Sequence, residues 1–357
     1  EPKSRGLGDV YKRQTVIRTI NYMTPRNVSR GGQLASYLTF VPASFAGAMR
    51  AGPLDVVFVT SPPLFPVISA MGVATARRAK LVLDLRDLWP DEIVAVGAGE
   101  EGSPAVRAMR MLERSAYRRA DMITCTTREF MRTVEERGAR RGKLVYLPNG
   151  ADLSLFHPRA ADNPVAAGYG FGDRFVVMYS GLLGIKHGLE AVVEAADLLR
   201  GRPDILFFLR GDGPRRAALE QMVAERGLDN VRFGGEIPLS DVPMVLARAD
   251  ACVTNLLPDP YLRKIISVKV FEYMAMAKPV VAALEGEGAR VVREADAGIV
   301  VRPGDPRGIA DAVVRLADDP GLRQRMGASG RRHVEERYSR QATARRLDQA
   351  LTQLCGR

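Results

Sequence analysis

A glycine-rich segment that contains one lysine is the strongest candidate for chemistry in this chain. Residues 180–190 read SGLLGIKHGLE, so that Gly181, Gly184 and Gly188 surround Lys186 directly before a predicted helix. Glycines let the backbone approach a phosphate closely, and a helix N-terminus adds N–H donors and positive dipole. We therefore predict a phosphate-binding loop in which Lys186 supplies a full charge. An ordinary strand-to-helix turn with a solvated lysine is the alternative.

Two later segments add groups that suit a nucleotide. Residues 210–214 read RGDGP, a Gly-X-Gly turn in which Gly211 and Gly213 permit close approach of a ligand, although this turn is a weak signal alone. Lys269 and Glu272 fall in the first turn of a predicted helix and face the same cleft. A carboxylate there either stabilises the helix dipole or accepts hydrogen bonds from a ribose diol.

The elements that must position these groups alternate regularly. Short apolar runs typical of buried parallel strands are separated by predicted helical segments, although no helix is predicted between the runs at 279–284 and 298–305. The strands are predicted at residues 54–60, 81–85, 122–126, 143–150, 175–181, 205–211, 231–235, 251–257, 279–284 and 298–305. Such alternation forms parallel sheets, which bind ligands outside the carboxyl ends of their strands. We expect an α/β protein with two doubly wound domains, divided in the loop-rich segment 151–173.

Length and composition agree with this class and exclude several others. A chain of 357 residues is longer than most single domains. Its 46% apolar and 26% charged residues are typical of a soluble globular protein and exclude disordered, collagen-like and disulfide-scaffold chains. Cys125, Cys252 and Cys355 lie far apart and fit neither a zinc site nor a disulfide framework, so a reducing cytoplasm is expected.

The net charge is +11, and 44 of the 52 basic residues are arginines. A basic surface could serve RNA, anionic lipid or phosphorylated small molecules. Because the sequence has no RNP-like aromatic string, zinc finger or recognition-helix signature, we expect no nucleic-acid partner.

Residues 31–49 carry no charge and are flanked by Arg26, Arg30 and Arg50. They are expected to form either an interfacial helix on an anionic membrane or a helix packed in the domain core.

The first residues have the features of a non-native leader. The chain begins EPKSRGLGDVYKRQ, and residues 9–14 resemble a translated transposon adapter. We therefore expect residues 1–14 to lie outside the fold, with a flexible natural terminus as the alternative. The fold itself is expected to begin with a strand at residues 15–22.

Several motifs occur in an order that carries a family resemblance. They are TSPPLF, DLRDLWPDE, ERSAYRRAD and LPNGADLSLFHP in the first half, and SGLLGIKHGLE, LRGDGP, VRFGGEIP, SVKVFEYMAMAKPVV and AGIVVRPGD in the second. From about residue 15 to residue 338 the chain resembles the family-4 glycosyltransferases of GT-B architecture. The motifs LRDLWP and KVFEYMA point to the bacterial branch that builds lipopolysaccharide, capsule or colanic acid.

The resemblance implies two Rossmann-like domains that face a cleft. Residues 15–157 would form the acceptor-side domain, without its first βαβ elements, and residues 158–335 the nucleotide-sugar donor domain. Residues 336–357 would form a C-terminal helix that returns to the first domain. Because of the missing elements, we expect the chain to bind a donor nucleotide more readily than it turns one over.

The resemblance also implies roles for individual residues. Lys186 would hold the donor diphosphate, and Glu272 would bind the ribose hydroxyls. Arg86 and Asp87 would lie near the transferred sugar and, with Lys186, act in catalysis. The donor-binding residues are Gly181, Gly184, Gly211, Gly213, Glu236, Ile237, Lys264, Lys269 and Glu272.

Three positions depart from the family pattern. Lys264 stands where the first glutamate of a paired motif is expected, Leu182 stands in place of an arginine, and Arg86 in place of a histidine. Lys186 would then meet the phosphate charge together with Arg263, Lys264 or Lys269, and the sequence does not rank these three.

The implied reaction is metal-independent transfer of a sugar from a UDP-sugar, with retention of anomeric configuration. No Asp-X-Asp pair occurs, so neither a metal nor another cofactor is expected. The acceptor would be a glycan or a polyprenyl-diphosphate-linked sugar, used in the cytoplasm or on the inner face of the plasma membrane. A non-catalytic nucleotide-sugar-binding module and a GT-B nucleotide-sugar epimerase are the alternatives.

Overall fold

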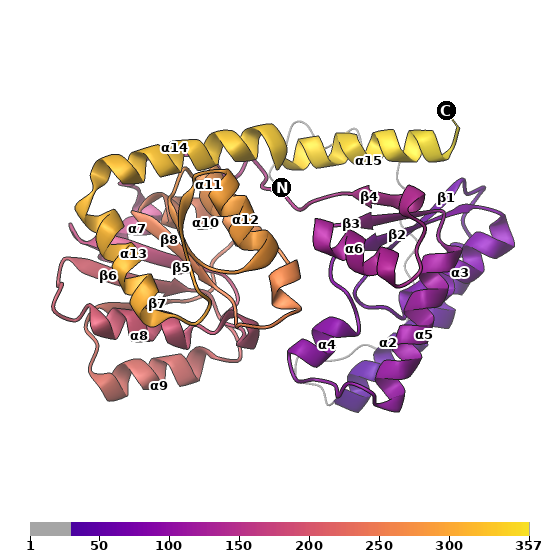
Figure 1. Cartoon of the computed structure of the whole chain (residues 1–357), viewed down its shortest axis with the longest axis horizontal. Helices are drawn as coiled ribbons and strands as arrows, with labels where there is room; N and C mark the ends of the chain where they lie inside the picture. Colours follow the sequence, from indigo (N-terminus) through magenta and orange to yellow (C-terminus); the bar gives the residue numbers. More distant parts are fainter. Residues whose placement is uncertain (1–29, 357) are drawn as a thin grey trace.

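Apolar runs of three to six residues form the strands of this protein, as their composition predicts. A computed structural model describes residues 30–356 and arranges them as two parallel sheets flanked by helices (Figure 1). The α/β class with two Rossmann-like halves is thereby confirmed. The predicted leader at residues 1–14 and the predicted strand at residues 15–22 lie outside the described residues.

The first sheet has four parallel strands in the order β1-β2-β3-β4. Its strands are β1 (Val56–Ser61), β2 (Lys80–Leu85), β3 (Met122–Cys125) and β4 (Leu144–Tyr146). The helices of this half are α2 (Arg30–Ala48), α3 (Pro66–Arg77), α4 (Asp91–Ala95), α5 (Pro104–Arg119), α6 (Arg128–Glu136) and the 3-10 turn η1 (Arg141–Lys143). Ser103 and Thr127 cap α5 and α6, because their hydroxyl oxygens accept hydrogen bonds from otherwise unpaired amides of the first turn.

The uncharged segment near the start of this half forms α2, which packs on α3. The Ser44 hydroxyl donates to the Ser69 hydroxyl at 2.9 Å, and the Phe45 ring lies over Gly72 so closely that a side chain there would meet it at 3.1 Å. This packing favours a helix within the domain. None of the helices in the described part of the chain is both long and apolar enough to cross a membrane. Contact with an anionic membrane stays a prediction.

The second sheet has six parallel strands in the order β10-β9-β8-β5-β6-β7. They are β5 (Phe175–Ser180), β6 (Ile205–Arg210), β7 (Val231–Gly234), β8 (Ala251–Asn255), β9 (Val280–Ala283) and β10 (Gly298–Val301). Val177 of β5 pairs with Phe207 of β6 on one side and Ala251 of β8 on the other. The strand order reverses between β5 and β8, the position at which doubly wound sheets bind ligands.

Helices bury both faces of the second sheet. Val177 and Tyr179 of β5 belong to one apolar cluster, whereas Val176 and Met178 belong to the other. The helices are α7 (Pro164–Ala167), α8 (Glu190–Leu198), α9 (Arg216–Arg226), α10 (Val242–Ala247), α11 (Val268–Ala275), α12 (Gly286–Glu294) and α13 (Pro306–Asp318), with the 3-10 turns η2 (Ile185–His187) and η3 (Leu262–Lys264). Sequence analysis missed α12, because Gly286 and Gly288 in its first turn are poor helix formers.

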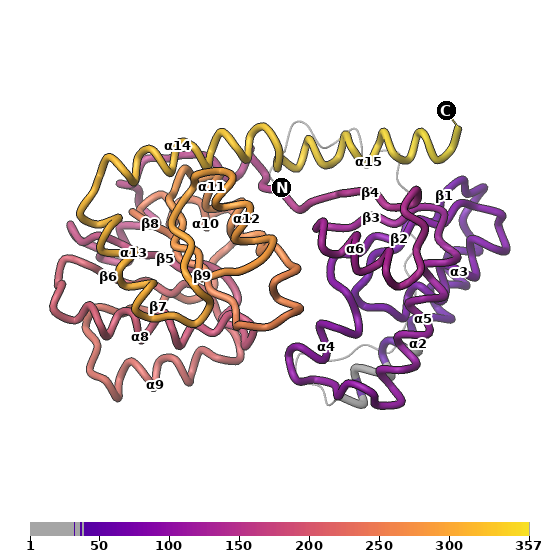
Figure 2. Tube along the Cα trace, viewed as in Figure 1, coloured from indigo at the N-terminus to yellow at the C-terminus, as the bar shows by residue number. Residues whose placement is uncertain are grey.

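The last two helices span both halves of the molecule. Figure 2 shows the chain passing along α14 (Pro320–Arg337) beside the second sheet and then along α15 (Arg340–Leu354) beside the first. At the junction the Ala151 amide donates to the Tyr338 carbonyl at 2.9 Å, and farther on the Thr343 hydroxyl donates to the Pro148 carbonyl at 3.2 Å. The C-terminal segment therefore ties the two sheets together on one side of the interface.

Candidate functional site

A cavity of about 430 Å³ opens where residues at the carboxyl ends of both sheets meet. Its walls come from the loop after β2, the loop after β5, the end of β6 and the start of α11. Six of the predicted site residues line it, namely Arg86, Asp87, Gly181, Lys186, Lys269 and Glu272. Groups that lie up to 186 positions apart in the sequence thus share one pocket.

The other predicted residues lie outside the walls of this cavity. Gly211 and Gly213 pack behind the first loop, where a side chain on Gly211 would lie 2.0 Å from the Gly181 carbonyl oxygen. Lys264 donates to the Thr133 hydroxyl at 3.0 Å and lines a different cavity between α6 and α12. The remaining residues of this group are Gly184, Glu236 and Ile237, whose donor contacts stay predictions.

Lys186 forms an ion pair that crosses between the two halves. Its Nζ lies 3.0 Å from Oε1 of Glu92, which belongs to α4. The lysine stands on η2, immediately after the turn at Gly184, and keeps 27% of its side-chain surface exposed. Lys186 is therefore already oriented toward the cavity by a carboxylate, and an anionic ligand would have to compete with Glu92 for it.

Arg86 is fixed to the edge of the first sheet. Its Nε donates to Asp84 Oδ2 at 2.7 Å, and its Nη1 donates to Asn149 Oδ1 at 2.9 Å. These two bonds hold the guanidinium in one plane at the cavity wall. Arg86 can consequently offer a fixed positive charge and further N–H donors to a ligand.

Asp87 lies beside Arg86 and is held from the opposite half. Tyr261 donates its hydroxyl hydrogen to Asp87 Oδ1 at 3.0 Å, while the same hydroxyl accepts from the Leu88 amide at 3.2 Å. Burial, together with the nearby carboxylate of Glu92, raises the pKa of Asp87 to about 6, although Lys186 and the hydrogen bond from Tyr261 oppose the shift. The carboxyl group therefore titrates close to neutral pH.

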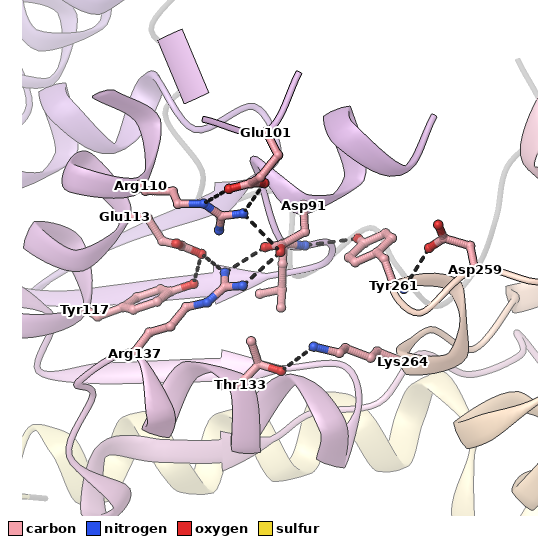
Figure 3. A network of polar contacts seen from close by, with 11 residues as sticks. Asp91, Glu101, Arg110, Glu113, Tyr117, Thr133, Arg137, Asp259, Tyr261 and Lys264 are labelled. Atoms are coloured by element: carbon pink, nitrogen blue, oxygen red, sulfur yellow. Dashed lines mark hydrogen bonds and ion pairs between the residues drawn. The ribbon is translucent and has the colours of Figure 1, made fainter. Parts of the chain in front are cut away.

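A partly buried ion network keeps α4 in place. Figure 3 shows the Arg137 guanidinium between Asp91 and Glu113, with bonds of 2.7 and 2.8 Å to Asp91 and 2.8 Å to Glu113. Tyr117 also donates to Glu113, at 2.6 Å. Burial alone would raise the pKa of Asp91, but the two bonds from Arg137 hold it below its ordinary value. The network fixes α4 and with it the position of Glu92.

Tyr261→Phe is expected to destabilise the protein by about 1–2 kcal/mol at pH 8 and by less at pH 5. The variant removes the acceptor of the Leu88 amide and the donor to Asp87. Because the pKa of Asp87 is raised in the folded state, its contribution to stability is present at low pH and is lost as pH rises through about 6. Without the tyrosine hydroxyl that loss becomes larger. Urea unfolding at the two pH values measures it.

The matched control is the same substitution in an Asp87→Asn background. There the cost of Tyr261→Phe should no longer depend on pH, since residue 87 carries no ionisable group. A pH-dependent cost in that background would contradict the assignment to Asp87.

Lys269 and Glu272 project from the first two turns of α11. The Lys269 ammonium lies 5.2 Å from the centre of the Tyr179 ring, and its stem fills the space beside Gly181, where a side chain would collide with it at 2.3 Å. Burial lowers the pKa of Lys269 to about 8, helped by Lys186 and Arg210 and opposed by Glu272. Burial also raises the pKa of Glu272. Gly181 is thus needed so that Lys269 can reach the cavity.

Arg210 is a lining residue that sequence analysis did not single out. It ends β6 and is 8% exposed, and its Nε donates to the Ser180 hydroxyl at 2.8 Å. Leu182, which stands where the family resemblance suggests an arginine, is 57% exposed and lines the same cavity. The available signal was an arginine at the end of a buried strand, directly before the Gly-X-Gly turn.

His187 also lines the cavity but has the character of a structural residue. Its ring packs edge-on against Tyr179 with centroids 5.8 Å apart, and burial lowers its pKa to about 3, so the imidazole is neutral. Among the described residues, no group of three or more histidine, cysteine or acidic side chains is arranged to hold a metal ion.

Two family models match the two halves of this arrangement. Residues 174–319 match the model described as "Glycosyl transferases group 1", and residues 10–150 match the "Glycosyl transferase 4-like domain". Fold and site thus define a two-domain α/β protein whose ligand cavity lies between its halves. The chain belongs to the family-4 glycosyltransferases with the GT-B fold.

Curated relatives agree with this assignment. The chain is 32% identical to alpha-D-kanosaminyltransferase of Streptomyces kanamyceticus, over 66% of this chain and 61% of that protein. It is 31% identical to the lipopolysaccharide core biosynthesis glycosyltransferase LpsD of Rhizobium meliloti, over 63% of this chain and 62% of that protein. The chain therefore spans about three fifths of the length of these relatives.

Solved structures share the fold at lower sequence identity. Alr3699/HepE of Anabaena, in complex with UDP and glucose, superimposes with a TM-score of 0.70 and 18% identity, covering 93% of this chain and 85% of that one. Sucrose-phosphate synthase of Thermosynechococcus elongatus gives a TM-score of 0.73 and 22% identity, covering 92% and 80%.

Proposed function

We propose that this protein transfers a sugar from a UDP-sugar to a glycan or a lipid-linked acceptor during synthesis of a bacterial surface polysaccharide. The observation that carries the proposal is the shared cavity, in which Lys186 and Lys269 of the second half face Arg86 and Asp87 of the first. A UDP complex of Alr3699/HepE and the lipopolysaccharide role of LpsD support the donor and the pathway class.

The donor would bind at the point where the strand order of the second sheet reverses. Lys186 and Lys269 would hold the diphosphate, and the Glu272 carboxylate would accept hydrogen bonds from the ribose hydroxyls. Departure of UDP builds negative charge on its outer phosphate. Positive groups held in place before the reaction lower the barrier, because they need not reorganise when that charge appears.

The transferred sugar would lie toward the first half, between Arg86 and Asp87. Asp87, oriented by Tyr261, can accept a hydrogen bond from a sugar hydroxyl, and Arg86 can donate one. In a retaining transfer the acceptor oxygen attacks from the face that UDP leaves, so no protein nucleophile is required. The departing phosphate takes the proton of the acceptor hydroxyl. In this proposal side chains supply the positive charge, without a metal.

The test is release of UDP. The protein is incubated with UDP-glucose or UDP-N-acetylglucosamine, each with and without a polyprenyl-diphosphate-linked sugar, and every reaction is run in the presence and in the absence of EDTA. We expect acceptor-dependent release of UDP together with a longer glycolipid product. Binding of UDP without release would favour a non-catalytic module, and a changed nucleotide sugar without release would favour an epimerase. Activity that disappears with EDTA would contradict metal independence.

Affinity for UDP is expected to fall about fivefold between pH 7 and pH 9.5. Lys269 has a pKa of about 8 and faces Lys186, Arg210 and Glu272. Below that pH it is an ammonium that attracts the diphosphate, and above it the amine is neutral, so affinity falls as pH rises. Calorimetric titration measures the dissociation constants. Uridine, which has no phosphate, serves as the control for ionisation of the base, and only the loss of UDP affinity beyond that of uridine reports on Lys269. An unchanged UDP affinity would remove Lys269 from the diphosphate site.

A further inference from the structure

Arg210 is a buried cation whose charge is not matched by a carboxylate. Among the described residues, Arg210 forms no ion pair or hydrogen bond with a carboxylate, and its Nε donates to a neutral hydroxyl, that of Ser180. Its environment lowers the pKa of Arg210 because of burial, but an arginine stays charged at any accessible pH. A buried charge is costly unless a partner compensates it.

The guanidinium lies among the charged groups of the cavity. Arg210 is close enough to lower the pKa of Lys269, and Glu272 and Glu236 are close enough to act on Arg210, although neither glutamate bonds to it. Hence Arg210 adds a third positive charge beside Lys186 and Lys269. Since its Nε points to Ser180, the two terminal nitrogens are the donors left for a ligand.

The loop after β5 lies beside Arg210 in the fold. Leu182 occupies the first loop and presents an apolar side chain to the cavity. The carboxyl ends of β5 and β6 are adjacent, because Ser180 pairs directly with Arg210 in the sheet. A long side chain at the end of β6 therefore brings its charge to the same part of the pocket as the apolar side chain of Leu182.

We propose that Arg210 binds a phosphate of the nucleoside diphosphate through its two terminal nitrogens. This inference rests on the proposed function, since it names a further residue of the same donor site. Paired N–H donors of a planar guanidinium match two phosphate oxygens, a geometry that lysine does not offer. Arg210 thereby distinguishes nucleoside diphosphates from nucleosides.

The experiment compares UDP and uridine binding to the wild-type chain, Arg210→Met and Arg210→Lys by calorimetry. Arg210→Met keeps the length of the stem and removes the charge, so UDP affinity should fall roughly 10- to 100-fold while uridine affinity stays unchanged. Arg210→Lys keeps the charge and should bind UDP with intermediate affinity. Arg226→Gln is the matched control, because Arg226 at the end of α9 pairs with Asp197, does not line the cavity, and should leave UDP binding as in wild type.

The outcomes separate this inference from the function on which it rests. If the wild-type protein fails to bind UDP, the proposed function itself is wrong. If wild type binds and Arg210→Met binds UDP equally well, Arg210 has no phosphate contact. An equal loss of UDP and uridine affinity overturns the inference too, because it assigns Arg210 to the nucleoside. Should Arg210→Met unfold, Arg210→Lys decides: a selective loss for UDP supports the contact, and wild-type affinity overturns it.

Discussion

Lys186→Ala is expected to lower kcat/KM for sugar transfer by about 100- to 1,000-fold, with little change in the free energy of unfolding. The lysine is partly exposed, and its ion pair with Glu92 is shared with solvent, so it contributes little to folding. In the proposed reaction its ammonium lies where negative charge appears on the leaving diphosphate. A group that acts in the transition state affects the rate far more than it affects the fold.

A second readout is specific to this geometry. Lys186 opposes the upward shift in the pKa of Asp87, which stands at about 6. Without Lys186 the pKa of Asp87 rises. Any step that requires ionised Asp87 loses activity as pH falls, and in the variant this loss should begin at a higher pH than in wild type. The pH dependence of kcat/KM measures this shift.

The matched control for Lys186→Ala is Lys80→Ala. Lys80 starts β2, at the edge of the first sheet opposite the cavity, and forms a surface pair with Asp121 at 3.7 Å. It should keep wild-type kinetics. If Lys186→Ala also behaves like wild type, the lysine is a solvated residue of an ordinary turn.

Gly211→Ala is expected to destabilise the protein by about 2–4 kcal/mol and to weaken UDP binding in the molecules that remain folded. Gly211 has a φ of +128°, a conformation that side chains rarely adopt. The added methyl carbon would lie 2.0 Å from the Gly181 carbonyl oxygen and 2.8 Å from its carbon. The loop after β5 would have to move, and Gly181 would then no longer leave the space that the Lys269 side chain now occupies.

Urea unfolding of Gly201→Ala provides the control for this second prediction. Gly201 lies in the turn before β6, where an added methyl carbon would meet nothing within 4 Å. Its substitution should change the free energy of unfolding by no more than about 0.5 kcal/mol. Equal stability of the two variants would show that the loops after β5 and β6 can separate at no cost.

Local patterns were sufficient for the strands and for most helices. Each of the ten predicted runs overlaps an observed strand, because a parallel strand buried on both faces is largely apolar and can be recognised in a short window. Helix α12 was not predicted, because its first turn has two glycines. Its stability comes from packing, since Gly286 lies against the Arg263 carbonyl with no room for a side chain. Tertiary contact overrides weak propensity there.

The sequence by itself determined which residues reach the cavity from the ends of strands. Gly181 and Lys186 follow β5, and Arg86 and Asp87 follow β2, so their place at the carboxyl edge of a parallel sheet follows from chain order. Lys269 and Glu272 were found because α11 begins at the same edge. A regular connection between strand, loop and helix is a local property, which is why it can be inferred without coordinates.

Only the tertiary structure decided how these groups meet across the two halves. The pair of Lys186 with Glu92, the bond of Tyr261 to Asp87 and the position of Lys264 beside Thr133 all depend on the orientation of one sheet relative to the other. That orientation arises from packing at the interface and from α14 and α15, which connect the sheets. Long-range packing leaves no periodic pattern in a single sequence, and therefore neither these contacts nor the unpaired charge of Arg210 could be read from it.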